Sequence, residues 1–116
     1  MSGELVIAEI DRLVAASADA DDVLRGVVAA LVSAGGCAWA GILFVEAGEL
    51  VLGPEAGSRR PDARLRLPVE FGGTRVAELV VDACPDAAVA EHVAASISEL
   101  CLVGWDTGGV PWESLG

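Results

Sequence analysis

The sequence predicts one α+β domain, in which an antiparallel sheet of about four to five strands carries N-terminal and C-terminal helices on one face. Apolar residues recur at helical spacing near both ends of the chain and at strand spacing in its middle. Gly-containing turns join the middle segments into hairpins, and hairpins build antiparallel sheets. Because 116 residues suffice for one hydrophobic core, we expect a single domain over residues 1–104 and a C-terminal tail over residues 105–116.

Three segments carry the helical pattern. Residues 4–16 form the first helix, and residues 21–34 form the second, with Gly35 at the C′ position where a helix commonly ends. The closing helix is expected to start with Pro85 at its first position, where a missing N–H is tolerated. Gly104 is expected to end it.

Four segments carry the strand pattern. They are residues 37–46, 49–53, 63–71 and 75–83. The first of them is apolar on both faces, which predicts a central strand. Residues 54–62 are expected to form a polar loop, and Gly72-Gly73 mark a hairpin turn.

The alternation of side chains predicts the register of the second hairpin. A three-residue turn places Leu67 opposite Leu79. It also places Arg64 opposite Asp82. A two-residue turn would place the carboxylate of Glu78 opposite Leu67, which is unfavourable. We therefore expect the longer turn.

The charge of the chain excludes two classes of partner. The net charge is −11, from 18 acidic residues and seven Arg. Such a chain repels phosphate backbones and anionic lipid, so we expect no nucleic acid and no membrane as partner. The uncharged stretch from Gly26 to Val45 is long enough to span a bilayer, but Ser33-Ala34-Gly35-Gly36 interrupts it. We expect a helix end followed by a buried strand.

The three cysteines are Cys37, Cys84 and Cys101. An odd number, the absence of a CxxC motif and an N-terminus without a basic leader predict reduced thiols in a cytoplasmic protein. Cys37 and Cys101 lie on apolar patterns and are expected to be buried. Cys84 stands before a helix N-terminus, which favours a reactive thiolate, whereas the neighbouring acids Asp82 and Asp86 disfavour it.

The element order and several motifs resemble the GAF domain family of small-molecule sensors. The matching residues in the second hairpin are Leu67-Pro68-Val69, Gly72-Gly73, Arg75-Val76 and Asp82. The first hairpin is similar to the free methionine-(R)-sulfoxide reductases of that family. The residues that carry this likeness are Trp39, Gly41, Leu43, Glu49-Leu50-Val51-Leu52-Gly53-Pro54 and Gly57.

The departures from the family are as informative as the matches. The resemblance implies catalytic cysteines on the segment after the Gly-Pro motif, and that segment is nearly deleted here and contains no cysteine. The same segment usually forms the lid of a GAF ligand pocket. Where Glu78 stands, the family typically has a small Gly. We therefore expect an open or very shallow ligand face that has turned polar.

The candidate ligand-binding residues are Trp39, Arg64, Arg66 and Glu78. Strand parity leaves open whether Trp39 faces a ligand or the core. The cluster Arg59, Arg60, Arg64 and Arg66 suits an anion or an acidic partner, or is a solvated face that balances an acidic surface.

No catalytic or metal-binding set is predicted, and no cofactor. His92 is the single histidine, and one His with scattered acids defines neither a triad nor a metal site. Trp105 and Trp112 of the tail are expected either to fold back onto the domain or to anchor a partner.

Three functions remain open. The first is a non-enzymatic regulatory or dimerisation module that forms a homodimer through its helices. The second is a sensor of a small-molecule ligand with a reduced pocket. The third, a thiol-dependent sulfoxide reductase of altered form, needs Cys84 and a second cysteine brought close by folding.

Overall fold

The computed structural model describes residues 3–15, 19–46, 48–102 and 110–111. The elements in chain order are α1 (Gly3–Ala15), α2 (Ala20–Ser33), β1 (Trp39–Glu46), β2 (Glu49–Gly57), the 3-10 turn η1 (Pro61–Ala63), β3 (Arg64–Phe71), β4 (Thr74–Asp82), α3 (Ala87–Ser96), α4 (Ser98–Cys101) and β5 (Val110–Pro111).

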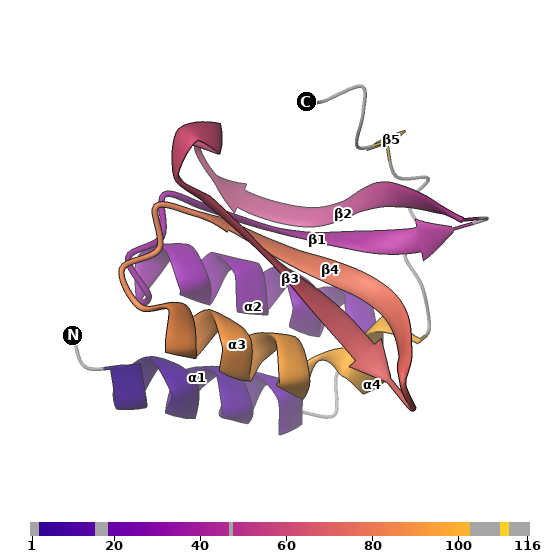
Figure 1. The fold of residues 1–116 in the computed structure, drawn as a ribbon. Helices are drawn as coiled ribbons and strands as arrows, with labels where there is room; N and C mark the ends of the chain where they lie inside the picture. Colours follow the sequence, from indigo (N-terminus) through magenta and orange to yellow (C-terminus); the bar gives the residue numbers. More distant parts are fainter. Residues whose placement is uncertain (1–2, 16–18, 47, 103–109, 112–116) are drawn as a thin grey trace.

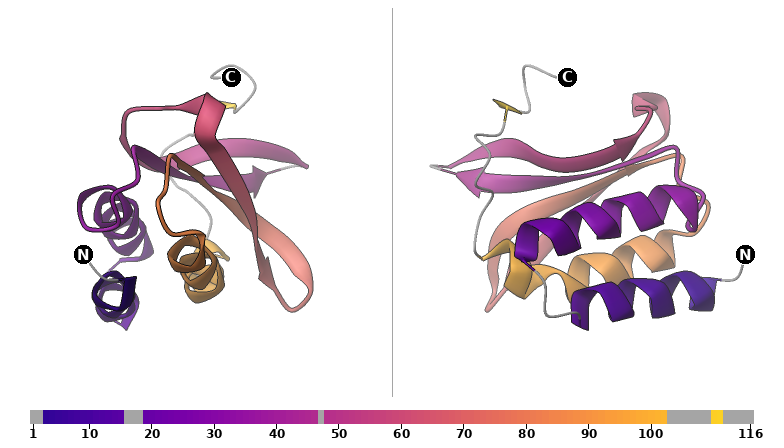
Figure 2. Two further views of the ribbon diagram at one scale, coloured as in Figure 1. Left: turned by 60° about the vertical axis from the view of Figure 1, so that its left-hand side comes forward. Right: turned by 180° about the vertical axis from the view of Figure 1, so that it is seen from behind.

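The strands form one antiparallel sheet with the order β3-β4-β1-β2-β5. The helices α1, α2 and α3 lie together on one side of this sheet (Figures 1 and 2). The predicted α+β class is confirmed, and so is the central place of β1, which pairs with both β2 and β4.

The second hairpin has the predicted register but reaches it by another route. Leu67 pairs with Leu79 and Arg64 pairs with Asp82, as the alternation of side chains predicted. The three-residue turn was wrong, because only Gly72 and Gly73 separate the two strands. A register shift after Val69 supplies the missing residue, and this bulge keeps Leu67, Leu79 and Val81 on the helix side.

Strand β2 is longer than the sequence predicted. It continues through Pro54 to Gly57, so the expected loop over residues 54–62 is wrong in its first part. A register shift with β1 lies between Gly41 and Leu43, where Gly53 and Pro54 both stand opposite Ile42. Pro fits a strand at such a bulge because it has no N–H to give to the ladder.

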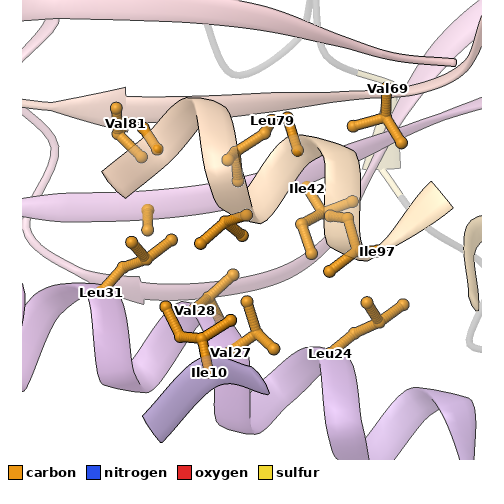
Figure 3. Close-up of a cluster of buried hydrophobic side chains, with 14 of the residues drawn as sticks. Ile10, Leu24, Val27, Val28, Leu31, Ile42, Val69, Leu79, Val81 and Ile97 are labelled. Carbon is orange, nitrogen blue, oxygen red and sulfur yellow. The ribbon is translucent and has the colours of Figure 1, made fainter. Parts of the chain in front are cut away.

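The main hydrophobic core lies between the helices and the sheet. Ile42, Leu79 and Val81 of the sheet face Leu24, Val28 and Leu31 of α2, with Ile10 of α1 and Ile97 completing the layer (Figure 3). The uncharged stretch from Gly26 to Val45 thus forms the end of α2 and most of β1, as expected. Among the described residues, no helix is long and apolar enough to cross a membrane.

The closing helix differs from its prediction. Ile97 leaves helical geometry, with φ −95° and ψ 1°, and divides the segment into α3 and α4. Pro85 precedes the helix instead of opening it, and Asp86 is the N-cap, its side chain accepting a hydrogen bond from the Ala88 N–H at 3.0 Å. The expected end at Gly104 and the tail residues Trp105 and Trp112 lie outside the described residues.

Candidate functional site

The candidate ligand-binding residues lie at and near one end of the sheet, on the face away from the helices. The connection from β2 to β3, which contains η1, crosses this face (Figure 1). Backbone hydrogen bonds fix both ends of the crossing segment. Ser58 N–H donates to the Ala38 carbonyl at 2.8 Å, and Ala83 N–H donates to the Ala63 carbonyl at 2.8 Å.

The structure settles the orientation of Trp39. It belongs to a small cluster on the outer face with Leu43, Leu52 and Val80, and its side chain has no exposed surface. Its indole Nε1–H donates to Glu55 Oε1 at 3.0 Å. The ring lies over Gly41, where a Cβ would stand 2.6 Å from Cζ2 of the indole and overlap it. Glycine at position 41 is therefore required for this packing.

Two guanidinium groups cover the indole. The Cζ atoms of Arg59 and Arg64 each lie 5.4 Å from the centroid of the Trp39 ring, which is cation–π distance. Arg59 also donates to Glu55, at 3.2 Å to Oε1. The aromatic surface that could receive a ligand is thus occupied by the side chains of this chain.

Asp82 holds this arrangement in place. Its carboxylate has no exposed surface and accepts two hydrogen bonds from Arg64, at 2.8 Å and 2.9 Å. It accepts a third from the Arg60 backbone N–H at 2.7 Å. A single buried carboxylate therefore binds both β3 and the crossing segment to the end of β4.

The environment of Asp82 changes its acidity. Burial, the largest single influence, acts to raise the pKa of Asp82 because it removes the carboxylate from water. The hydrogen bonds from Arg64 and Arg60 and the charges of Arg64 and Arg59 oppose it. Together they hold the pKa of Asp82 below its ordinary value of 3.8. The ion pair is therefore present throughout the neutral range.

Glu78 makes a second ion-pair cluster on the same face. It is 5% exposed, and its carboxylate pairs with Arg66 and with Arg75, the latter at 3.5 Å. The four candidate residues thus form two sets, Trp39 with Arg64 and Arg66 with Glu78. Three of the four arginines in residues 59–66 form ion pairs with Glu55, Asp82 and Glu78 of the same chain.

The prediction of three reduced thiols is wrong. Cys37 and Cys84 form a disulfide between residues 47 positions apart in the sequence, because the ends of β1 and β4 are adjacent. Cys37 is buried as expected, and Cys84 is half-buried. Cys101 is free and buried, and burial raises the pKa of its thiol to about 12. Cys101 is thus an inert thiol.

The single histidine lies apart from the candidate ligand-binding residues. His92 on α3 lies at the surface of the helix layer, on the opposite side of the sheet from Trp39 (Figure 1). Its Nε2 bonds Asp11 of α1 at 2.7 Å. No group of three His, Cys, Asp or Glu side chains suited to a metal ion occurs within the described part of the chain. A surface groove of about 270 Å³ lies between β3 and α3, away from the site. Its walls are Leu67, Pro68, Glu70, Glu91, Ala94 and Ala95.

The fold of the chain can be compared with known structures. The chain superposes on a free methionine-R-sulfoxide reductase from Neisseria meningitidis, solved with its substrate, with a TM-score of 0.73 and 19% identity over 86% of this chain and 88% of that one. It superposes on the GAF domain of an Acinetobacter phosphoenolpyruvate-protein phosphotransferase with a TM-score of 0.72 and 13% identity over 95% and 99% of the two chains. The chain has a GAF-like fold.

A third GAF domain, from A. aeolicus and solved in an inactive state, gives a TM-score of 0.72 at 11% identity over 87% of this chain and 96% of that one. No protein-family model and no curated protein sequence matches the chain. The resemblance found in the two hairpins is thus supported by the GAF-like fold of the whole domain.

Sequence reasoning missed three contributors to the site. Glu55 falls in the predicted loop over residues 54–62, whereas it lies in strand β2 and accepts the Trp39 Nε1–H. Asp82 was placed opposite Arg64 but not identified as the acceptor for the crossing segment. The pairing of Cys37 with Cys84 was missed because only the β1–β4 neighbourhood brings them together.

Replacing Arg64 with Met should lower the free energy of unfolding at neutral pH by about 3–5 kcal/mol, because the buried Asp82 carboxylate loses its cation. Because the pKa of Asp82 is lower in the folded protein than in the unfolded chain, its ionisation stabilises the fold at pH values above the pKa of the unfolded chain. This stabilisation is lost as the pH falls through the pKa of the folded protein. The difference from wild type should therefore shrink below pH 3.8. Urea denaturation over a series of pH values measures it.

Arg60→Met is the matched control, because the Arg60 side chain is exposed in the same segment and only its backbone N–H binds Asp82. It should change the free energy of unfolding by no more than about 0.5 kcal/mol, with no acid dependence of its own. Equal losses in the two variants would contradict the role given to Asp82.

Replacing Gly41 with Ala should destabilise the domain by about 1–3 kcal/mol, because the added Cβ displaces the Trp39 indole. Gly26→Ala is the control. Gly26 lies inside α2, and its added Cβ would contact Leu13 of α1 at an ordinary 3.5 Å. Because Ala is favoured over Gly within a helix, this substitution should stabilise the domain by roughly 0.5–1 kcal/mol. Urea denaturation compares them, and a Gly41→Ala protein as stable as wild type would refute the packing.

Proposed function

We propose that this GAF-like domain is a non-enzymatic regulatory or assembly module whose ligand face is filled by its own side chains. The observation that carries the proposal is the complete burial of Trp39 beneath Arg59 and Arg64. A ligand seeking the aromatic face must first displace both guanidinium groups. Arg64 resists displacement because it is tied to a buried carboxylate.

Electrostatics support the same conclusion. An anionic ligand would have to compete with Asp82 for Arg64 and with Glu78 for Arg66. The exchange at Arg64 takes the ion-pair partner from the fully buried Asp82 carboxylate, which costs about 3–5 kcal/mol. The exchange at Arg66 leaves the buried Glu78 carboxylate with Arg75 alone. A cationic ligand meets the opposite obstacle, since the acidic groups already hold cations. The face is thus suited to holding the domain together more than to exchanging ligands.

The partner that we propose is a second copy of the chain, bound through the helix layer. Three partly buried apolar side chains of α1, those of Ile7, Leu13 and Val14, pack at the margin of the core. Ala8 is exposed on the same helix, and a small side chain there allows a second helix to approach closely. The filled sheet face leaves the helices as the surface for assembly.

Native mass spectrometry of the freshly purified protein should show a dimer with no added mass. Ala8→Glu should shift it toward monomer because it brings a charge into the helix contact, whereas Ala29→Glu on α2 should not. A stoichiometric extra mass, lost in Trp39→Ala, would contradict the proposal and favour a small-molecule sensor. A monomer would contradict the assembly role.

A thiol-dependent sulfoxide reductase is the second candidate, because folding brings Cys84 to a second cysteine. Incubation with free methionine sulfoxide and a dithiol, followed by quantification of methionine, separates the two candidates. If the domain is an assembly module, the wild-type protein should form no more methionine than the Cys84→Ser variant. Turnover that is abolished by Cys84→Ser and retained by Cys101→Ser would establish the reductase instead.

A further inference from the structure

The disulfide stands at the centre of the same end of the sheet as the candidate site. Cys37 lies on the connection from α2 to β1, and Cys84 lies on the connection from β4 to α3. These connections meet at the end of the molecule where the β2–β3 crossing begins and ends (Figure 1). One covalent bond therefore joins two loops that a third segment crosses.

Short backbone links connect the disulfide to the cover of Trp39. Two residues beyond Cys37 stands Trp39, and two residues before Cys84 stands Asp82, and these two residues pair across β1 and β4. Between them, Ala38 N–H donates to the Asp82 carbonyl at 2.9 Å. Ala83, next to Cys84, donates to the Ala63 carbonyl of the crossing segment.

Ala83 is held in an unfavourable conformation. Among the described residues it is the non-glycine residue with a positive φ, at 51°. A side chain with a Cβ adopts this region only where its surroundings impose it. The surroundings here are the Cys84 disulfide on one side and the hydrogen bond to Ala63 on the other. The positive φ of Ala83 thus lies between a bond that a reductant can break and a hydrogen bond that holds the crossing segment.

The two cysteines of the disulfide differ in exposure. Cys37 is 3% exposed, whereas Cys84 is half-buried between the exposed residues Ala83 and Pro85. A small thiol therefore reaches the Cys84 sulfur first. Cys37 is then the leaving group, retained inside the domain and ready to reform the bond.

We propose that Cys37 and Cys84 form a redox-active site for small dithiols and disulfides, and that its state sets how closely the segment 58–63 covers Trp39. The proposal rests on the proposed function, because it assigns a control to the filled ligand face. In the oxidised domain the face is closed. In the reduced domain the crossing segment loosens and Trp39 becomes accessible.

The exchange balances without any further reactant. A thiolate of a dithiol attacks the Cys84 Sγ, the S–S bond breaks, and its electron pair leaves on the Cys37 Sγ, which takes a proton from water. The second thiol of the reductant attacks the mixed disulfide, releasing Cys84 and a cyclic disulfide. Two electrons and two protons pass to the pair. Oxidised glutathione reverses the reaction: it accepts the two electrons and two protons from the reduced cysteines and is released as two molecules of glutathione.

The test uses the whole chain with Trp105→Phe and Trp112→Phe, so that Trp39 alone emits. One sample is treated with oxidised glutathione and one with dithiothreitol. Alkylation and intact mass should count one free thiol in the first and three in the second. Acrylamide should quench Trp39 severalfold more strongly in the reduced sample, while far-ultraviolet circular dichroism stays unchanged.

Two variants complete the experiment. Cys84→Ser should show the strong quenching under both treatments, and Cys101→Ser should respond as the parent does. Failure of the disulfide to form, equal quenching in both states, or loss of helical signal on reduction would each overturn the proposal, the last by making the bond a structural staple. A dimer without bound ligand would still support the proposed function, so the two proposals fail separately.

Discussion

The buried carboxylate of Asp82 is the group on which the rest of the outer face depends. It lies at the end of β4 and binds Arg64 of β3 and the backbone of Arg60 in the crossing segment. Without it, the short connection between β2 and β3 would keep the backbone hydrogen bonds at its two ends but lose its attachment at Arg60 and Arg64. Because the carboxylate is removed from water, each of these bonds matters more than a surface ion pair would.

The anchored segment determines what the sheet face can do. It brings Arg64 and Arg59 over the Trp39 indole. The ring packs against Gly41, which has no side chain to collide with it. In this way the short connection between β2 and β3 covers the aromatic residue. The domain closes the face with its own side chains where a longer connection could have enclosed a ligand. This filled face is the physical basis on which we propose an assembly or regulatory role.

The disulfide adds a second tie to the same place. It joins the loops that flank Trp39 and Asp82, so the covalent bond and the ion pair act on one small region. Ala83 lies between Asp82 and Cys84 in the chain and has a positive φ. A region fixed by two separate interactions can respond when one of them is chemically reversible.

The periodicity of apolar residues in the sequence determined the fold class, the central strand β1 and the register of the β3–β4 hairpin. Local chemistry was enough for these, because a slip of one residue would bury Glu78 against Leu67. The pairing of Trp39 with Glu55, of the crossing segment with Asp82, and of Cys37 with Cys84 was decided only in the tertiary structure. Each joins residues whose distance in space depends on how strands far apart in the chain are ordered in the sheet, and single-strand patterns carry no information about that order.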